Sequence, residues 1–426
     1  MIKIIFFLLV FFLSTFLNAQ EVITIDYCID RAEKNYPIIK NELLIQNKAE
    51  KNLKVLNSGY LPALDFVGQA TWQSDVTNID IDVPFITEPI TDVPKDQYKV
   101  ALELSQVIWD GGAISGRKDL EKSNTKVEIA KIANDIYAYK EKIVDLYFNL
   151  LVLNKQNEII TIKRWQLREQ IKELHSGVEN GVVLQSQLDI LLAEQIKIEQ
   201  NLIDIEYEVL AVREMLEYLM GEEIPEFANI LLPTPNIKAN NSINRPEIDY
   251  FNALKMQAAS SEALISKGRM PKLMAFAQLG YGRPGLNMLS DEFDTYAVVG
   301  AKFVWNIWDW NKTKRNREII GINLQMIDNQ KNQFEMFQQS QAQAQIKRIE
   351  KYDKLIMKDE EIVELRKGIT SSYSSQLKNG VVRASDYIIA LNEEQAAMLN
   401  LGMHEILLSK AKYSWLMAVG KQNENN

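Results

Sequence analysis

The side chains that most often carry out chemistry or bind transition metals are scarce in this sequence. The two histidines, His175 and His404, and the single cysteine, Cys28, lie far apart in the chain, which leaves little material for a soft-metal site. The sequence also lacks a Gly-x4-Gly-Lys-Ser/Thr phosphate loop and a Ser/His/Asp constellation with the needed partners. We therefore expect no enzymatic activity, no catalytic residue, no metal and no cofactor. The histidines are interpreted as packing or surface residues, and Cys28 as a small buried apolar residue.

Function must then follow from architecture, and the sequence contains an internal repeat. Asn180-Gly181-Val182-Val183 recurs as Asn379-Gly380-Val381-Val382, a shift of 379 − 180 = 199 residues. The other matching pairs are Trp109-Asp110 with Trp308-Asp309 and Gly221 with Gly420 at the same shift, and Asn35-Tyr36-Pro37 with Asn244-Arg245-Pro246 and Leu61-Pro62 with Met270-Pro271 at a shift of 209. The chain is a tandem duplication of a unit of roughly 200 residues, with a ten-residue deletion between Pro271 and Trp308.

The N-terminus has the layout of a secretory signal peptide. One positive charge, Lys3, precedes a nearly unbroken apolar run from Ile4 to Phe16, and we expect residues 1–19 to be removed after Ala19. A membrane anchor is the weaker alternative, because the run is shorter than the ~20 residues of a spanning helix. The formal charge of −9 without Lys/Arg runs makes nucleic-acid binding improbable.

Residue patterns predict the same order of elements in both copies. The first repeat (20–221) starts with a helix from Thr24 to about Asn57 that breaks near Tyr36, because Pro37 disrupts helical hydrogen bonding. It continues with strands at about 61–73 and 97–109 and long helices at about 113–176 and 185–220. A linker (222–243) leads to the second repeat (244–421), with strands at about 271–283 and 295–308 and long helices at about 311–376 and 383–419. Residues 422–426 form a polar tail.

The strands alternate apolar and polar residues over 10–12 positions, the length of a tilted transmembrane strand. A soluble, half-buried hairpin would alternate in the same way. Four tryptophans favour the membrane, because such rings gather at lipid–water interfaces; they are Trp72, Trp109, Trp305 and Trp308. The acidic stretch 74–96 is expected to form an outward loop.

The returning helix of copy one carries a heptad seam that begins with Leu188 and Leu191 and ends with Leu216 and Leu219, as in a left-handed coiled coil. A second apolar row, comprising Leu192, Ile196, Ile203 and Leu210, predicts that this helix packs against neighbours on two sides.

Two copies of the unit supply four strands, too few to close a barrel. In lipid every unpaired strand edge costs several kcal/mol per backbone group. The chain is therefore expected to oligomerise, and eight strands from two chains or twelve from three both remain open.

The duplicated plan, the Asn-Gly-Val-Val turns, the Trp-Asp pairs and the terminal glycines resemble the TolC family of outer-membrane efflux proteins over the whole mature chain. The resemblance implies a mostly α fold with a transmembrane β part: a homotrimer whose 12-stranded β-barrel continues into a periplasmic α-helical barrel. It implies an outer-membrane exit duct, in contact with outer-membrane lipid, for a tripartite efflux or type I secretion system of a Gram-negative cell. The implied partners are a periplasmic adaptor protein and an inner-membrane RND or ABC transporter.

The resemblance also assigns residues. Asp386 matches an aspartate that rings the periplasmic entrance in that family, whereas a second family position holds Ile389 and the copy-one equivalent is Gln187. Arg383 lies beside Asp386 in the sequence and is expected at the same constriction, where it either pairs with Asp386 to hold the tip shut or is solvated. The alternative is that Asp386 is a solvated residue in the first turn of its helix, stabilised by the helix dipole. The predicted adaptor-contacting turns contain Asn180, Gly181, Val182, Asn379, Gly380 and Val381.

The leading hypothesis is a passive, gated conduit for small molecules or polypeptides. The competing hypothesis is a soluble periplasmic coiled-coil scaffold or adaptor, which would need no detergent for extraction and would form no pore.

Overall fold

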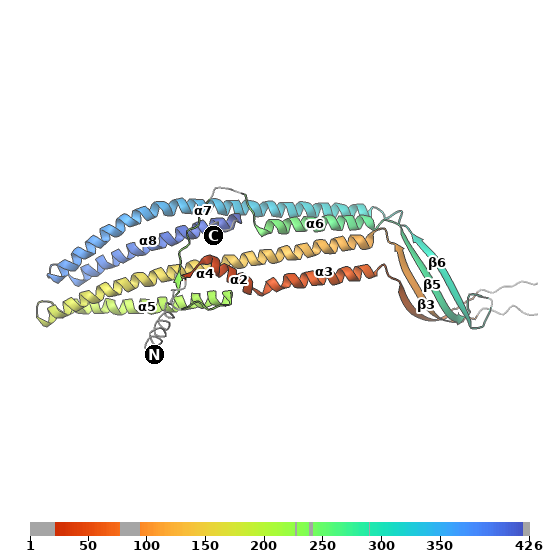
Figure 1. Cartoon of the computed structure of the whole chain (residues 1–426), viewed down its shortest axis with the longest axis horizontal. Coiled ribbons are helices and arrows are strands. Elements are labelled where there is room, and N and C mark those ends of the chain that lie inside the picture. The colour runs from red at the N-terminus through yellow and green to blue at the C-terminus, as the bar shows by residue number, and fades with distance from the viewer. Residues whose placement is uncertain (1–21, 77–93, 226–227, 238–241, 289, 421–426) are drawn as a thin grey trace, which may run out of the picture. The chain divides into compact units, whose positions relative to one another are not determined.

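The computed structural model describes residues 22–76, 94–225, 228–237, 242–288 and 290–420 (Figure 1). The expected signal peptide (1–19), most of the expected outward loop and the tail (422–426) lie outside the described residues. The chain divides into two compact units. The sheet unit comprises 42–130 and 250–330, and the helical unit comprises 1–41, 131–249 and 331–426.

The sheet unit contains one four-stranded antiparallel sheet in the order β2-β3-β5-β6. The strands are β2 (Ala63–Trp72), β3 (Asp96–Trp109), β5 (Lys272–Arg283) and β6 (Asp294–Val304). The predicted end of the last strand at about 308 is wrong. Lys272 is the last partner of β6, opposite Val304, and Pro271 before it lacks the N–H that a further ladder bond would need. Trp305 and Trp308 therefore follow the strand.

The long helices are close to prediction: α4 (Ala113–Glu179), α5 (Gln185–Met220), α7 (Lys312–Lys378) and α8 (Ala384–Val419). The N-terminal helical segment breaks at Tyr36 as expected, into α2 (Ile25–Asn35), the 3-10 turn η1 (Pro37–Ile39) and α3 (Lys40–Ser58). Thr24 caps α2 by accepting a hydrogen bond from the Tyr27 N–H at 3.2 Å. The counterpart of α3 in copy two is α6 (Pro246–Lys267). Within the described residues, no helix has the length and apolar character needed to cross a membrane.

The core of the helical unit joins segments that are distant in sequence. Tyr147 on α4 is fully buried, and its hydroxyl donates to the Ile23 and Leu231 carbonyls at 3.0 and 2.5 Å. Ile23 belongs to β1 (Val22–Ile23), which pairs in parallel with β4 (Asn229–Ile230), and Leu231 directly follows β4. This short pairing inside the linker was not predicted from the sequence. Cys28 is buried in the same core, and burial raises the pKa of its thiol to about 12, so the thiol is unreactive at neutral pH.

The repeated Asn and Gly motifs meet in the helical unit. Asn35 donates from its side chain to the Met220 carbonyl at 2.6 Å, and the Asn244 N–H donates to the Val419 carbonyl at 2.8 Å. The glycines that follow, Gly221 and Gly420, have φ of 70° and 74° and end α5 and α8. A Cβ atom on Gly420 would lie 2.3 Å from the Asn244 carbonyl oxygen. In both copies, therefore, the segment around the repeated Asn packs closely against the C-terminal end of the returning helix.

Candidate functional site

One face of the four-stranded sheet is apolar from edge to edge. The register places Phe66 beside Leu102 and Leu102 beside Leu279. This face includes Leu64, Phe66, Gly68 and Ala70 on β2, Tyr98, Val100, Leu102 and Leu104 on β3, Leu273, Ala275, Ala277, Leu279 and Tyr281 on β5, and Ala297, Val299, Ala301 and Phe303 on β6, with Gln106 and Thr295 as polar members. Phe66 is 74% exposed and Val299 82%. The sheet therefore exposes its apolar face, the reverse of a soluble sheet.

The opposite face of the sheet carries the polar groups. The Gln278 amide donates to the Glu103 carboxylate, and the Lys99 ammonium donates to the Gln278 oxygen at 3.5 Å. The same ammonium lies 5.4 Å from the centre of the Tyr296 ring. A sheet with one apolar face and hydrogen-bonded charged groups on the other matches a barrel wall between lipid and water.

Aromatic rings mark both ends of the apolar face. At one end Phe293 stacks on Tyr98 and Tyr281 at centroid distances of 6.4 and 5.5 Å; at the other, Trp308 meets Trp310 edge-on at 5.8 Å. Tyr98 and Trp109 lie 109 − 98 = 11 residues apart on β3. At ~3.3 Å per residue and ~40° tilt this spacing gives ~28 Å of height, close to the thickness of a bilayer core.

The four predicted tryptophans follow this arrangement. Trp72 lies at the Tyr98 end, and Trp109, Trp305 and Trp308 lie at or beyond the other strand ends. All four are exposed. Their role at the membrane interface stays a prediction. The cluster of Tyr98, Tyr281 and Phe293 was not predicted, because Phe293 lies in a loop whose position no periodicity predicts.

The repeated Trp-Asp pairs have a structural role at the start of the long helices. Asp110 accepts from the Gly112 and Ile114 N–H groups at 2.8 and 2.5 Å, and Asp309 accepts from the Thr313 N–H at 2.9 Å. Hydrogen bonds from Thr313 lower the pKa of the Asp309 carboxyl. Both aspartates thus cap α4 and α7 and keep each strand joined to its helix.

The two Asn-Gly turns at the far ends of the helices have the same geometry. Asn180 and Asn379 donate from their side chains to the carbonyls four residues earlier, at 2.8 and 2.9 Å. Gly181 and Gly380 have φ of 74° and 68°, which glycine adopts without strain. The neighbouring Val182 and Val381 are 79% and 70% exposed. Each turn therefore presents an apolar side chain to the surroundings.

Asp386 and its copy-one counterpart both act at the start of α8. The Asp386 carboxylate accepts from the Arg383 backbone N–H at 3.2 Å, and Gln187 accepts from the Ala384 N–H at 2.7 Å. Arg383 thus contacts Asp386 through its backbone N–H. The Arg383 guanidinium carries only N–H donors, so it cannot accept a backbone N–H in return and complete a reciprocal cap. The structure thus gives Asp386 a capping hydrogen bond that was not predicted from the sequence; its entrance role and its stabilisation by the helix dipole both stay predictions.

An apolar cluster joins the ends of the two helical hairpins. Leu167 of α4, Leu191 of α5 and Leu391 of α8 are fully buried in it. Lys378 forms an ion pair with Glu173 at 2.6 Å beside the cluster. Burial and the Glu394 and Glu173 charges raise the pKa of Tyr387 to about 12. This contact between α4 and the second hairpin was not predicted, because the residues that make it lie about 200 positions apart in the sequence.

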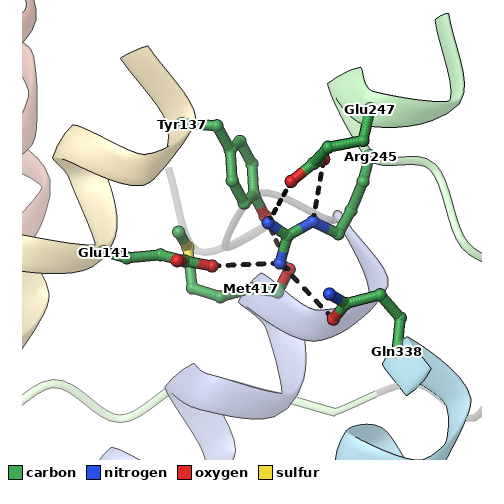
Figure 2. A network of polar contacts seen from close by, with 6 residues as sticks. All are labelled: Tyr137, Glu141, Arg245, Glu247, Gln338 and Met417. Atoms are coloured by element: carbon green, nitrogen blue, oxygen red, sulfur yellow. Dashed lines mark hydrogen bonds and ion pairs between the residues drawn. The ribbon is translucent and has the colours of Figure 1, made fainter. Parts of the chain in front are cut away.

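A second junction is centred on Arg245, the residue aligned with Tyr36 by the repeat (Figure 2). Its guanidinium is 6% exposed and binds both Glu247 oxygens, at 3.0 and 2.5 Å, and Glu141 of α4 at 3.0 Å. It also donates to Gln338 of α7 at 3.5 Å and to the Met417 carbonyl of α8 at 3.4 Å. The central carbon of the guanidinium lies 4.4 Å from the centre of the Tyr137 ring. One side chain therefore links α4, α6, α7 and α8.

His175 and His404 take part in side-chain contacts only. His404 of α8 lies 2.5 Å from the Asp359 carboxylate of α7, and His175 is exposed next to Glu179 at 3.4 Å. In the part of the chain that the structure describes, no three His, Cys, Asp or Glu side chains gather as metal ligands would.

Comparison with known proteins identifies the fold. No family profile and no curated protein sequence matches the chain. Solved structures do match. The outer membrane protein VceC of Vibrio cholerae has a TM-score of 0.67 at 15% identity, covering 94% of this chain and 97% of VceC. The CmeC outer membrane channel of Campylobacter jejuni has 0.66 at 14%, covering 94% and 87%. The open state of the Neisseria gonorrhoeae MtrE outer membrane channel has 0.67 at 14%, covering 93% and 89%.

The Arg245 junction yields a prediction about stability. Arg245→Met removes a buried cation and leaves Glu141 and Glu247 without their partner, so we expect a loss of about 3 kcal/mol of unfolding free energy. Arg366→Met, which breaks an exposed ion pair with Glu393 in the same unit, is the matched control and should cost under about 1 kcal/mol. Chemical unfolding followed by circular dichroism measures both. Equal losses for the two variants would contradict the role of Arg245.

Proposed function

We propose that this chain, whose fold is that of the TolC-family outer-membrane channels, is the outer-membrane exit duct of an export system. The observation that carries the proposal is the four-stranded sheet with an exposed apolar face, a polar opposite face and two open edges. Its strands would lie in the outer membrane and its long helices in the periplasm. The duct would be passive, with no enzymatic step of its own.

The open edges determine how copies would assemble. Within the described residues, β2 and β6 are each paired on one side only. Because all neighbours in the sheet are antiparallel, β6 of one copy and β2 of the next would also run antiparallel. Joining copies in this way continues the same antiparallel strand order until the sheet closes into a barrel. The number of strands in that barrel is a multiple of four.

Three copies fit a conduit better than two. Eight-stranded barrels have interiors filled by their own side chains. At a strand spacing of ~4.8 Å and a tilt of ~40°, twelve strands enclose a backbone radius of ~12 Å, whereas eight enclose only ~8 Å. A homotrimer with twelve strands, as the resemblance to the TolC family implies, is therefore the smallest ring with room for cargo.

Exposed apolar rows on the helices support contact between copies. On α5 the second row includes Ile196 and Ile203, which are exposed in the single chain. On α7 Met336, Met357 and Leu365 are exposed as well. In a ring of helices each row would lie against a neighbouring copy, as the two-sided packing predicted for α5 requires.

The Asn-Gly turns are the surface that we propose for the periplasmic adaptor. Val182, Leu184 and Val381 are exposed apolar side chains at or next to these turns. A cavity of about 480 Å³ between α4, α7 and α8 opens nearby and includes Trp165 and Glu169. Through the adaptor, an inner-membrane RND or ABC transporter would supply the cargo and the energy, for small-molecule efflux or polypeptide secretion.

A soluble periplasmic scaffold is the competing function. It would have to leave the apolar sheet face in water, at a cost of about 25 cal/mol for each Å².

Planar-bilayer recordings test the proposed function. The purified full chain should require detergent for extraction and should then insert to give discrete conductance steps, because its apolar sheet face needs lipid and its polar face needs water. A chain that is soluble without detergent and shows no conductance would support the scaffold and contradict the duct.

Two variants of Asp386 separate its charge from its helix cap. Asp386→Asn keeps an oxygen that can accept from the Arg383 N–H, whereas Asp386→Ala removes both cap and charge. If three carboxylates ring the entrance, cation selectivity in reversal-potential measurements should fall in both variants, while only Asp386→Ala should lower helix stability, by about 1 kcal/mol. Unchanged selectivity in both would leave Asp386 as a cap alone.

A further inference from the structure

The polar face of the sheet pairs aromatic rings with glycines. Tyr296 of β6 is the register partner of Gly280 on β5, and Phe276 of β5 is the partner of Gly300 on β6. A Cβ atom on Gly280 would lie 2.2 Å from Cζ of Tyr296, and one on Gly300 would lie 2.7 Å from Cζ of Phe276. Each ring therefore occupies the space that a side chain on its glycine partner would take.

Burial shows how the Tyr296 ring lies. Tyr296 is only 8% exposed, whereas the other residues of its strand on this face are half-buried or exposed. On the far side of Gly280 its next partner, Ala101 of β3, is 3% exposed, and Lys99 of β3 reaches the ring. The ring thus lies flat across β5, from β6 towards β3, and does not stand up from the sheet.

The orientation of these rings matters for a narrow barrel. In the proposed twelve-stranded barrel the backbone radius is ~12 Å. From standard covalent dimensions, a tyrosine ring that stood upright would reach ~6 Å inwards, about half of that radius. Three copies would place three such rings, and three more from Phe276, around the same passage.

The charges on this face are balanced, so the width of the passage is the property by which the wall can select cargo. Lys99 and Lys302 face Asp65 and Glu103 on the same side of the sheet. Two positive and two negative groups between the strand ends give no net charge, and Gln278 links Lys99 to Glu103. At this level the wall therefore discriminates little between positively and negatively charged cargo.

We propose that Gly280 and Gly300 determine the size of cargo that the barrel passes, because their missing side chains let Tyr296 and Phe276 lie flat against the wall. This inference rests on the proposed function, in which the polar face lines the passage. The two pairs act independently, since each ring has its own glycine.

The test uses the full chain in planar bilayers, with neutral polyethylene glycols of graded size added on the side of the loops. Polymers that enter the barrel lower its conductance, so the largest active polymer measures the width. Gly280→Ala should push Tyr296 off the wall and reduce that size limit. Gly280→Ala combined with Tyr296→Ala should restore it, because the displaced ring is gone.

Two further variants keep the test decisive. Tyr296→Phe keeps the ring and removes only a buried hydroxyl that has no hydrogen-bond partner among the residues that the structure describes, so its size limit should equal that of the unmodified chain. Gly300→Ala, with Phe276→Ala as its rescue, tests the second pair and serves if Gly280→Ala does not assemble. An unchanged size limit in both glycine variants would overturn this inference and leave the duct standing. Absence of any conductance from the unmodified chain would overturn the proposed function itself.

Discussion

Backbone hydrogen bonding at the two edges of a four-stranded sheet is the constraint on which the structure depends. The sheet carries apolar side chains on one face and polar ones on the other, yet β2 and β6 have no second partner within the described residues. In water such edges are solvated, whereas in lipid each unpaired N–H or C=O costs several kcal/mol. A sheet of this kind in lipid would therefore also have to pair its edges with further copies. The antiparallel order allows β6 of one copy to pair with β2 of the next without any change in the sheet.

The duplication explains how the helices are held to that sheet and to one another. Asp110 and Asp309 cap the helices that follow the second strand of each copy. At the other end, the Asn-Gly turns reverse the chain with the same side-chain hydrogen bond in both copies. The copies differ where Gly111 and Gly112 are replaced by Trp310 and Asn311, which keep positive φ of 55° and 60°. Copy two thus has, at Trp310 and Asn311, the left-handed backbone that glycine adopts without strain in copy one.

Much of this organisation could be predicted from the sequence, because it depends on local periodicity. Alternation along 61–73 and 97–109 predicts both strands and the face that each residue joins, and the heptad from Leu188 predicts the buried side of α5. The predicted end of β6 was wrong because β6 ends where its partner strand does. That end is determined by Pro271, which lies before β5 and not in β6 itself. Arg245 could not be assigned, since its hydrogen-bonding partners on α4, α6, α7 and α8 lie far apart in the sequence. The glycine–ring pairs likewise depend on register, which alternation leaves undetermined.

The account is tested most directly by disulfides across the edge where copies are proposed to meet. Gln69→Cys on β2 is combined with Cys at Asp294, Val298 or Lys302 on β6; the native Cys28 is buried and free. Within one chain two strands separate β2 from β6, so these residues lie ~14 Å apart, beyond the reach of a disulfide. Oxidation should give a covalent species of three chains and none larger, for at least one pair. Only single chains, or a covalent species that closes at two, would contradict the twelve-stranded barrel.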